Sequence, residues 1–296
     1  MTIRQALNSA TRILKRKSTS PSLDAEVLLA YVLKKPKTDI FVRMDNFVYK
    51  RDRQKFLALI KKRSQGWPVA YLTHEKEFFG LKFYVDKNVL IPRPETEGLV
   101  DLVLEKLKIV NYKLKILDIG TGSGCIIVSL AKSLRNAELV SASQPRDPEI
   151  NSEFRYFASD ISSAALKIAR KNARRHKVKV NFKKSNLLSA WKNQRFDVIV
   201  ANLPYLAKET DPSTKFEPKK ALIAKNHGLG LIAKLLQQIS TLSAPPSALF
   251  LEIGHDQGAK IKKLAAKWLP SFDTKIFRDM SGKNRYAILN APDLIL

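Results

Sequence analysis

Strand-like and helix-like patterns alternate along the chain from Lys113 onward. Short apolar runs such as LKILDIG, FRYFASD and FDVIVANL are separated by longer runs with apolar residues at helical spacing, such as SSAALKIARKNARRH. This alternation is typical of a doubly wound sheet with helices on both faces. The last two strand-like runs, TKIFRDM and RYAILN, are joined only by SGKN and should be antiparallel. The sequence predicts an α/β fold with a Rossmann-like, mostly parallel sheet and antiparallel C-terminal strands.

The residues before this region have a different pattern. Residues 1–74 are predicted to form a small helical domain, because SPSLDAEVLLAYVLKK and RDRQKFLALIKKRSQG carry apolar residues at helical spacing. Residues 75–90 alternate apolar and polar side chains around Gly80, which predicts a β-hairpin linker. Residues 91–296 are then the sheet domain. Within it, residues 136–153 are polar and contain proline, which predicts a surface insertion.

The chain is strongly basic. Its 53 Lys and Arg residues exceed its 27 Asp and Glu residues, giving a net charge of +26. Such a balance favours an anionic partner, with RNA or a ribonucleoprotein as the first expectation and a lysine-rich proteome as the alternative. The basic runs contain no interleaved aromatic residues, unlike a groove for single-stranded nucleic acid.

Several other classes are disfavoured by composition. The single cysteine, Cys125, excludes an intramolecular disulfide and a cysteine-based zinc site, and the four histidines lack ligand spacing, so no metal is expected. No apolar run approaches the length of a membrane span. The first 23 residues lack acids, as in a transit peptide, but they continue into a well-patterned helix. A cytoplasmic enzyme is therefore expected.

A glycine-rich loop follows the first strand of the sheet domain. In LDIGTGSG the glycines are two residues apart, and Cys125 stands where a dinucleotide fingerprint has its third glycine. Glycine gives clearance for a ligand that lies close to the backbone, and S-adenosylmethionine needs this clearance for its ribose and amino-acid tail. Asp118 could face its cationic methionine end; the structural alternative is a tight turn. The predicted cofactor loop comprises Asp118, Gly120, Thr121, Gly122, Ser123 and Gly124.

An acid at the end of the next strand completes the predicted nucleotide-like site. Asp160 in YFASDIS ends a strand and begins a helix, where a carboxylate can hold ribose hydroxyls. Its alternative role is a helix N-cap. It lies 40 residues after Gly120, and the insertion at 136–153 accounts for the long spacing.

The tetrapeptide NLPY ends the fourth strand of the predicted sheet. An amide nitrogen is a poor nucleophile unless acceptors hold its hydrogens and orient it. The side-chain oxygen of Asn202 and the backbone carbonyl of Leu203, beside rigid Pro204, could be those acceptors. Tyr205 could stack on a planar amide or a base. Positioning alone would supply the acceleration, with no general base; an ordinary strand-to-loop turn is the alternative.

These segments together resemble class I methyltransferases that modify a glutamine side chain, in particular the release-factor glutamine methyltransferases (PrmC/HemK). The similarity extends over nearly the whole chain, and its most specific part is LIPRPETE at Leu90–Glu97. The other matching parts are SPSLDAEVLLAYVL, LDIGTGSG, SDISSAALKIARKNA, NLPY, EPKKALIA, LEIGHDQG and Arg285.

The resemblance implies methylation of the N5 nitrogen of the glutamine in the Gly-Gly-Gln loop of peptide-chain release factors, the proteins of translation termination. S-adenosylmethionine would be the methyl donor. Gly120–Gly124 and Asp160 would bind the cofactor, and Asn202 would touch both cofactor and substrate. The residues expected to line the glutamine pocket are Leu203, Pro204 and Tyr205, with Asn202, Pro204 and Tyr205 as the catalytic set.

The chain departs from the family pattern in three places, one of which is the atypical insertion at residues 136–153. Leu203 replaces the usual first proline of NPPY, so the loop is expected to be less rigid. After the third strand, Asn186 and Leu187 stand where the family often has an acid and an aromatic residue near the adenine; Asn186 could still bind the adenine edge.

Three alternatives remain open from sequence. NLPY is also found in rRNA dimethyladenosine methyltransferases, so an RNA or DNA adenine-N6 methyltransferase is the second hypothesis. Such enzymes must bind and flip a base, and their recognition domain usually follows the catalytic core. A ribosomal-protein glutamine methyltransferase shares the same motifs. A non-catalytic RNA- or ribosome-binding protein would suit the charge, but the intact motifs oppose it.

Overall fold

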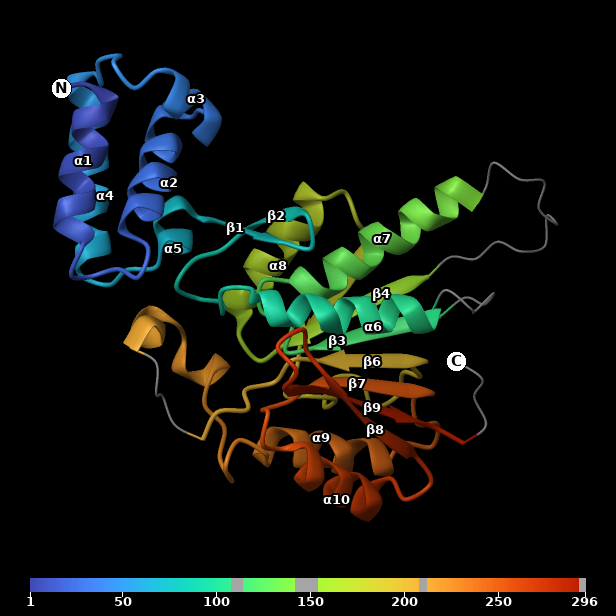
Figure 1. Cartoon of the computed structure of the whole chain (residues 1–296). Coiled ribbons are helices and arrows are strands. Elements are labelled where there is room, and N and C mark those ends of the chain that lie inside the picture. Colours follow the sequence, from blue (N-terminus) through green and yellow to red (C-terminus); the bar gives the residue numbers. More distant parts are fainter. Residues whose placement is uncertain (108–113, 142–153, 208–211, 293–296) are drawn as a thin grey trace. The chain divides into compact units, whose positions relative to one another are not determined.

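The computed structural model describes residues 1–107, 114–141, 154–207 and 212–292 (Figure 1). The chain forms two compact units. The first comprises Met1–Glu75 together with Thr210–Phe216, and the second comprises Lys76–Glu209 together with Glu217–Leu296. No sequence pattern indicated that a second piece of chain joins the helical unit.

The first unit is helical. The N-terminal helix begins with a capping box, in which the Thr2 hydroxyl accepts from the Gln5 backbone and the Gln5 side chain accepts from the Thr2 backbone. A partly buried ion pair joins Arg63 to Asp24 at 2.6 Å. The Trp67 ring stacks on Phe216 of the 3₁₀ segment η2 (Pro212–Phe216) at 4.6 Å between centroids. The helices are α1 (Ile3–Leu14), α2 (Pro21–Leu33), α3 (Lys37–Val42), α4 (Lys50–Ser64) and α5 (Val69–Thr73).

The predicted hairpin is confirmed. Strands β1 (Glu75–Phe78) and β2 (Leu81–Tyr84) pair across a two-residue turn, in which Phe79 and Gly80 have φ values of 51° and 68°. Two successive positive φ values match the right-handed twist of paired strands. A 3₁₀ turn, η1 (Pro94–Thr96), then leads into α6 (Glu97–Leu107).

A seven-stranded sheet forms the second unit and confirms the predicted fold class. The strand order is β5-β4-β3-β6-β7-β9-β8. All neighbours from β5 to β7 are parallel, and β9 is antiparallel to both β7 and β8. The strands are β3 (Lys115–Ile119), β4 (Arg155–Asp160), β5 (Val180–Lys184), β6 (Val198–Ala201), β7 (Ala248–Glu252), β8 (Asp273–Arg278) and β9 (Asn284–Asn290).

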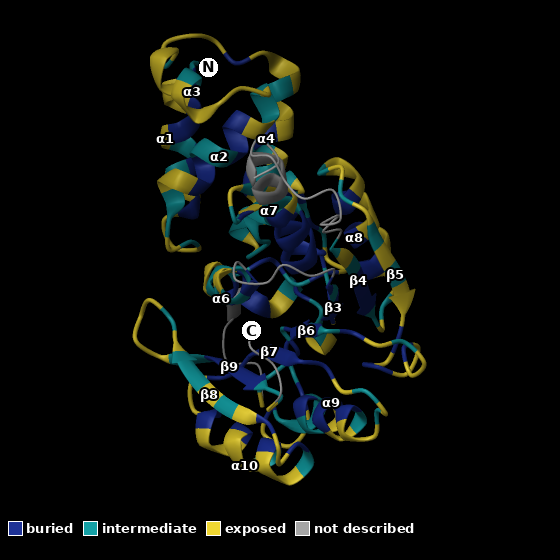
Figure 2. Cartoon of the chain, turned by 90° about the vertical axis from the view of Figure 1, so that its right-hand side faces the viewer, coloured by how far each residue is buried: buried dark blue, intermediate teal, exposed yellow. Residues whose placement is uncertain are grey.

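Helices cover both faces of the sheet. Because strand side chains alternate, Ile116 of β3 packs in one core with α6, α7 (Cys125–Ser141) and α8 (Ser163–Arg175). Leu117 packs in the opposite core with α9 (Gly230–Ser240) and α10 (Gly258–Trp268). Buried residues accordingly fill the central strands and the helix faces that cover them, whereas the edge strands β5 and β8 contain none (Figure 2). A short 3₁₀ segment, η3 (Lys219–Ala221), precedes α9.

The predicted insertion at 136–153 is partly corrected. Helix α7 continues to Ser141, so the first six residues of that segment are helical and not irregular. Residues 142–153 lie outside the described residues. Residues 136–141 read NAELVS, and the prediction overlooked that Ala137, Leu139 and Val140 continue the apolar content of the preceding helix.

Candidate active site

The carboxyl ends of four neighbouring parallel strands bring the candidate residues to one edge of the sheet. The glycine loop follows β3, Asp160 ends β4, Asn202 follows β6, and Glu252 ends β7. From β3 the chain adds β4 and β5 on one side and then returns to place β6 on the other. Open α/β sheets bind ligands at such a switch point. The expectation that NLPY lies at this edge is confirmed.

The glycine loop has a backbone that only glycine adopts readily. Gly120, Gly122 and Gly124 have φ values of 75°, 54° and 82°. A Cβ on Gly120 would come within 3.1 Å of Leu203 Cδ2, and one on Gly124 would come within 3.2 Å of Ala169. Every second residue of the loop is therefore glycine because it has a positive φ, and two of these glycines also lie close to Leu203 and Ala169.

Asp118 is a buried acid beneath this loop. Its Oδ2 accepts a hydrogen bond from the Thr121 hydroxyl at 2.6 Å, whereas its Oδ1 has no partner among the described residues. Burial raises the pKa of Asp118 to about 7. A buried acceptor without a partner is costly, and a cationic group placed beside the loop would relieve that cost. The loop therefore suits a ligand with a cationic end.

Asp160 joins the glycine loop to the start of α8 through its two carboxylate oxygens. Its Oδ2 accepts from the Gly122 backbone at 3.0 Å, and its Oδ1 accepts from the Ser162 backbone at 2.8 Å. The N-cap of α8 is Ser162, whose side chain accepts from Ala165, so the alternative assignment of Asp160 as that cap is wrong. Burial raises the pKa of Asp160. Each carboxylate oxygen can accept a further hydrogen bond from a ligand hydroxyl.

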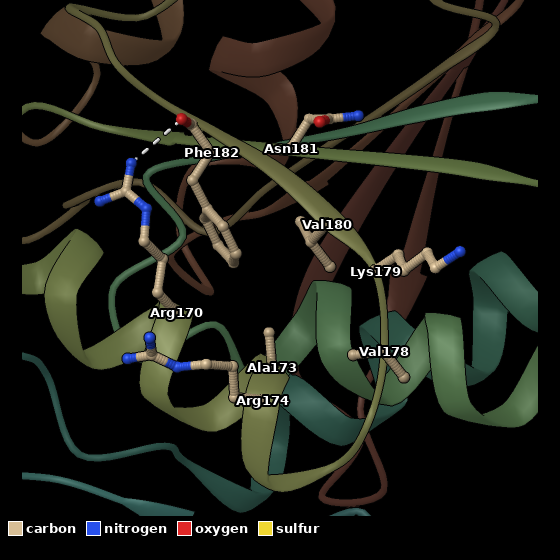
Figure 3. A pocket seen from close by; sticks show the side chains of 8 residues that line it. All are labelled: Arg170, Ala173, Arg174, Val178, Lys179, Val180, Asn181 and Phe182. Atoms are coloured by element: carbon tan, nitrogen blue, oxygen red, sulfur yellow. Dashed lines mark hydrogen bonds between the residues drawn. The ribbon is translucent and has the colours of Figure 1, made fainter.

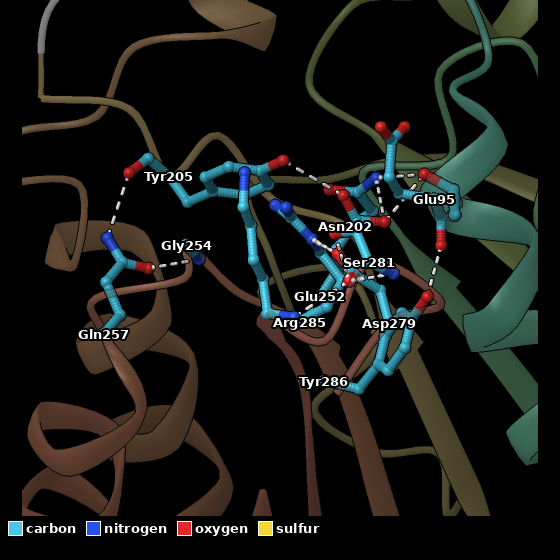
Figure 4. Close-up of polar contacts among 12 residues, drawn as sticks. Glu95, Asn202, Tyr205, Glu252, Gly254, Gln257, Asp279, Ser281, Arg285 and Tyr286 are labelled. Carbon is cyan, nitrogen blue, oxygen red and sulfur yellow. Dashed lines mark hydrogen bonds and ion pairs between the residues drawn. The ribbon is translucent and has the colours of Figure 1, made fainter. Parts of the chain in front are cut away.

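A buried polar network surrounds Asn202 (Figure 4). Glu252 is 1% exposed, and its Oε2 accepts from the Thr96 hydroxyl at 2.7 Å and from Asn202 Nδ2 at 2.9 Å. The other oxygen of Glu252, Oε1, accepts from the Tyr205 hydroxyl at 3.1 Å. Asn202 Nδ2 also donates to the Thr96 hydroxyl at 3.1 Å, so two acceptors hold the amide nitrogen on this side. The side-chain oxygen of Asn202 is consequently turned away from Glu252, and no residue in the part of the chain that the structure describes donates to it.

The charge states in this network follow from burial. Burial raises the pKa of Glu252, opposed by the hydrogen bonds from Thr96 and Tyr205. Burial, together with the negative charge of Glu252, also raises the pKa of Tyr205, so its hydroxyl remains a donor at neutral pH. Tyr205 therefore cannot serve as a general base, in agreement with a site that works by positioning.

The backbone of the NLPY loop is held from a second direction. The carbonyl of Tyr205 accepts from Gln257 Nε2 at 3.0 Å, and Gln257 Oε1 accepts from the Gly254 backbone at 2.9 Å. Gly228 approaches the same carbonyl so closely that a Cβ there would lie 1.8 Å from its oxygen. Nearby, Arg285 pairs with Asp279 at 3.0 Å.

Leu203 occupies a different environment from the one expected. Its side chain is 4% exposed and packs in the core against Gly120, so only its backbone could line a substrate pocket. No described residue donates a hydrogen bond to its carbonyl. Pro204 and Tyr205 are half-buried beside it.

The two residues expected near an adenine differ in exposure. Asn186 is exposed, and its backbone donates to the Ser189 hydroxyl. Leu187 has a φ of 55° and a side chain buried in the core. Asn186 therefore offers a polar side chain at the surface, and Leu187 supports the turn.

Comparisons with known proteins identify the family. Residues 5–73 match the PrmC N-terminal domain family, and residues 111–290 match a methyltransferase domain family. The release factor glutamine methyltransferase of Koribacter versatilis is 34% identical over 99% of both chains. That of Burkholderia pseudomallei is 37% identical over 85% of this chain and 86% of its own. The chain belongs to the release factor glutamine methyltransferase family.

Solved structures agree with the fold of this family member. The catalytic domain of hMettl16, in complex with MAT2A 3′UTR hairpin 6, has a TM-score of 0.55 at 16% identity, covering 83% of this chain and 84% of that one. A methyltransferase from Pyrococcus furiosus has a TM-score of 0.50 at 17% identity, covering 83% of this chain and all of the other. At these identities the likeness shows the fold alone.

Three residues that contact the NLPY loop in this family member were not predicted from the sequence. Thr96, Glu252 and Gln257 lie within quoted motifs, LIPRPETE and LEIGHDQG, but received no role. A signal for Glu252 existed, because it ends the apolar strand ALFLE at the edge where ligands bind. Within the described ranges, no group of three potential metal ligands occurs, and no helix combines the length and apolarity needed to cross a membrane.

Proposed function

We propose that the protein transfers a methyl group from S-adenosylmethionine to the N5 amide nitrogen of the glutamine in the Gly-Gly-Gln loop of peptide-chain release factors. The observation that carries this proposal is the orientation of Asn202. Glu252 and Thr96 hold its amide nitrogen, so its oxygen is free to accept from a planar amide at the switch point. The family relatives are named for this substrate.

The residues present fit the proposed cofactor. The Oδ1 of Asp118, which has no partner among the described residues, suits the cationic methionine end. The glycines of Gly120–Gly124 have no side chains, so the ribose could approach the loop backbone. Asp160 has acceptor capacity for ribose hydroxyls, and Asn186 could bind the adenine edge next to Leu187. When bound, the cofactor supplies a methyl group already activated on a sulfonium.

The chain's own residues would orient the glutamine. The Asn202 side-chain oxygen and the Leu203 carbonyl accept the two amide hydrogens, which fixes the nitrogen toward the methyl carbon. Pro204 restricts the loop backbone, and the Tyr205 ring packs on the amide plane. The amide nitrogen of the glutamine would accept the methyl group from the sulfonium of a bound cofactor and would then lose one amide proton to water. Tyr205 and Glu252 keep the acceptor geometry without exchanging protons.

Cofactor affinity should depend on the ionisation of Asp118. Its pKa of about 7 means that the carboxyl group becomes progressively protonated as the pH falls below that value. A neutral Asp118 no longer attracts the cationic end, so affinity should fall by up to about tenfold per pH unit below that point. Calorimetric titration between about pH 5.5 and 7.5 measures this. Asp118→Asn should bind weakly with a flat profile; an unchanged slope in that variant would remove Asp118 from the binding site.

Asp160→Ala should raise the cofactor Kd. Losing a hydrogen bond to a charged group costs roughly 1–3 kcal/mol, and the Gly122 backbone would lose its brace as well. The same titration at neutral pH measures the effect, with Asp273→Ala on an exposed strand position as the control. An unchanged cofactor Kd would contradict a role in cofactor binding. Asp160 would then only accept the structural hydrogen bonds from Ser162 and Gly122.

The domain organisation completes the proposal. Residues 1–74 would recognise the release factor, residues 75–90 would link the two domains, and residues 91–296 would carry out catalysis. The matched N-terminal family supports the first assignment. A substrate of translation termination also favours a cytoplasmic location and occasional encounter with ribosomes or RNA.

The deciding experiment supplies labelled S-adenosylmethionine with one acceptor at a time. Purified release factor should become labelled, and its variant with Gln→Ala in the Gly-Gly-Gln loop should not. Ribosomal proteins and rRNA serve as competing acceptors. Label in rRNA and not in protein would contradict the proposal in favour of an adenine methyltransferase, for which NLPY was the sequence argument. Label in a ribosomal protein alone would show that the substrate is a ribosomal-protein glutamine and not a release factor.

A further inference from the structure

Positive charge is concentrated in one stretch of the chain. Residues 161–196 contain eleven of the 53 basic residues and none of the 27 acidic residues. All eleven of these basic residues are exposed. The stretch itself therefore contributes positive charge and no carboxylate to this part of the surface. They are Lys167, Arg170, Lys171, Arg174, Arg175, Lys177, Lys179, Lys183, Lys184, Lys192 and Arg195.

The fold arranges much of this stretch around a groove. Helix α8 and strand β5, the edge strand of the sheet, enclose a volume of about 550 Å³. Figure 3 shows Arg170 and Arg174 on the helix side and Lys179 on the strand side. Apolar side chains, including Val180 and Phe182, lie between these cations. The groove thus combines cationic rims with an apolar lining.

Aromatic rings accompany the cations on this part of the second unit. The guanidinium of Arg170 lies 5.6 Å from the centre of the Phe182 ring, and Arg170 also donates to the Phe182 carbonyl. Lys171 lies 3.1 Å from the Tyr84 ring, which comes from the distant strand β2. The basic runs contain no aromatic residue in sequence, but the fold brings rings from β5 and β2 beside them.

We propose that the α8–β5 face, defined by Arg170, Arg174, Lys179 and Phe182, binds single-stranded RNA. Guanidinium groups pair with phosphate oxygens, and aromatic and arginine planes stack on unpaired bases. Exposed lysines on an edge strand also discourage strand association, but that role does not require the arginines of α8. Strand β5 is separated from β6 and its NLPY loop by two strands. The groove lies at the start of β5, whereas Asn186 follows its end, so the groove includes none of the residues proposed for methyl transfer.

The test measures binding of a fluorescent single-stranded RNA of about 15 nucleotides by anisotropy over a range of salt concentrations. The triple variant Arg170→Gln/Arg174→Gln/Lys179→Gln should bind roughly tenfold or more weakly. Its plot of log affinity against log salt should lose about two units of slope, since each phosphate contact to a single strand contributes about 0.7. Phe182→Leu should weaken binding roughly fivefold or more at nearly unchanged slope.

The matched control is Lys260→Gln/Lys262→Gln/Lys263→Gln. These lysines are exposed on α10, which packs on β8 and β9 at the opposite edge of the sheet, and the change in net charge is the same. The control should bind RNA as the wild type does, and both variants should methylate release factor normally, which verifies their folding. Equal losses in both triples, absence of RNA binding by the wild type, or equally effective competition by polyglutamate would overturn the proposal.

Discussion

Asn202→Ala should abolish detectable methyl transfer, with kcat lowered at least about 10²-fold, while the cofactor Kd changes only modestly. The side-chain oxygen of Asn202 is the acceptor that Glu252 and Thr96 turn outward, and alanine has nothing to replace it. The amide of a bound glutamine would lose one of its two orienting contacts. Single-turnover methylation of release factor, together with calorimetric titration of the cofactor, separates chemistry from binding.

Asn193→Ala is the matched control for this variant, because Asn193 is an exposed asparagine of the same unit. It should retain full activity. Full activity in Asn202→Ala would remove Asn202 from the mechanism, whatever the behaviour of the control. A variant with a greatly weakened cofactor Kd would instead assign Asn202 mainly to cofactor binding.

Glu252→Gln should lower kcat by roughly 10–10²-fold with little change in the KM for release factor. Three donors converge on the Glu252 carboxylate, from Thr96, Asn202 and Tyr205. A glutamine of the same size presents one oxygen and one NH₂ group, so either the Tyr205 hydroxyl must turn from donor to acceptor or the new NH₂ group faces that of Asn202. The Asn202 amide would be free to rotate, and the free energy of unfolding should fall by roughly 1–3 kcal/mol.

The kinetic pattern distinguishes positioning from a merely structural role for Glu252. A destabilised but correctly arranged site would lose activity only near its lower melting temperature, whereas a misoriented Asn202 lowers kcat at every temperature. Glu77→Gln, at an exposed position of β1, is the control and should have normal kinetics. Wild-type kcat in Glu252→Gln well below its melting temperature would contradict the assigned role.

Local patterns in the sequence were sufficient to predict the sheet, the glycine loop and the position of NLPY. Each depends on residues close together in the chain: the period of apolar side chains, glycines at spacing two, and a proline after a β-branched run. The carboxyl ends of parallel strands share one edge, so Asp160 and Asn202 could be placed together before their distances were known.

The remaining features depend on residues that the fold brings together from far apart. Thr96 contacts Asn202 across 106 positions, and Tyr205 contacts Glu252 across 47. Leu203 was expected to loosen its loop, but its side chain packs beneath Gly120 because β3 and β6 are neighbours. No local pattern encodes such pairings, which arise only when strand order is fixed.

The stacking of Trp67 on Phe216 has a consequence for dividing the protein into fragments. The helical unit includes Thr210–Phe216, so the chain crosses between the two units more than once. A fragment that ends at residue 75 would lack Phe216 and uncover one face of the Trp67 ring. Addition of a synthetic peptide spanning 210–216 should therefore raise the melting temperature of that fragment. In this sense the helical unit is a composite of two separate chain segments, and a single cut cannot release it whole.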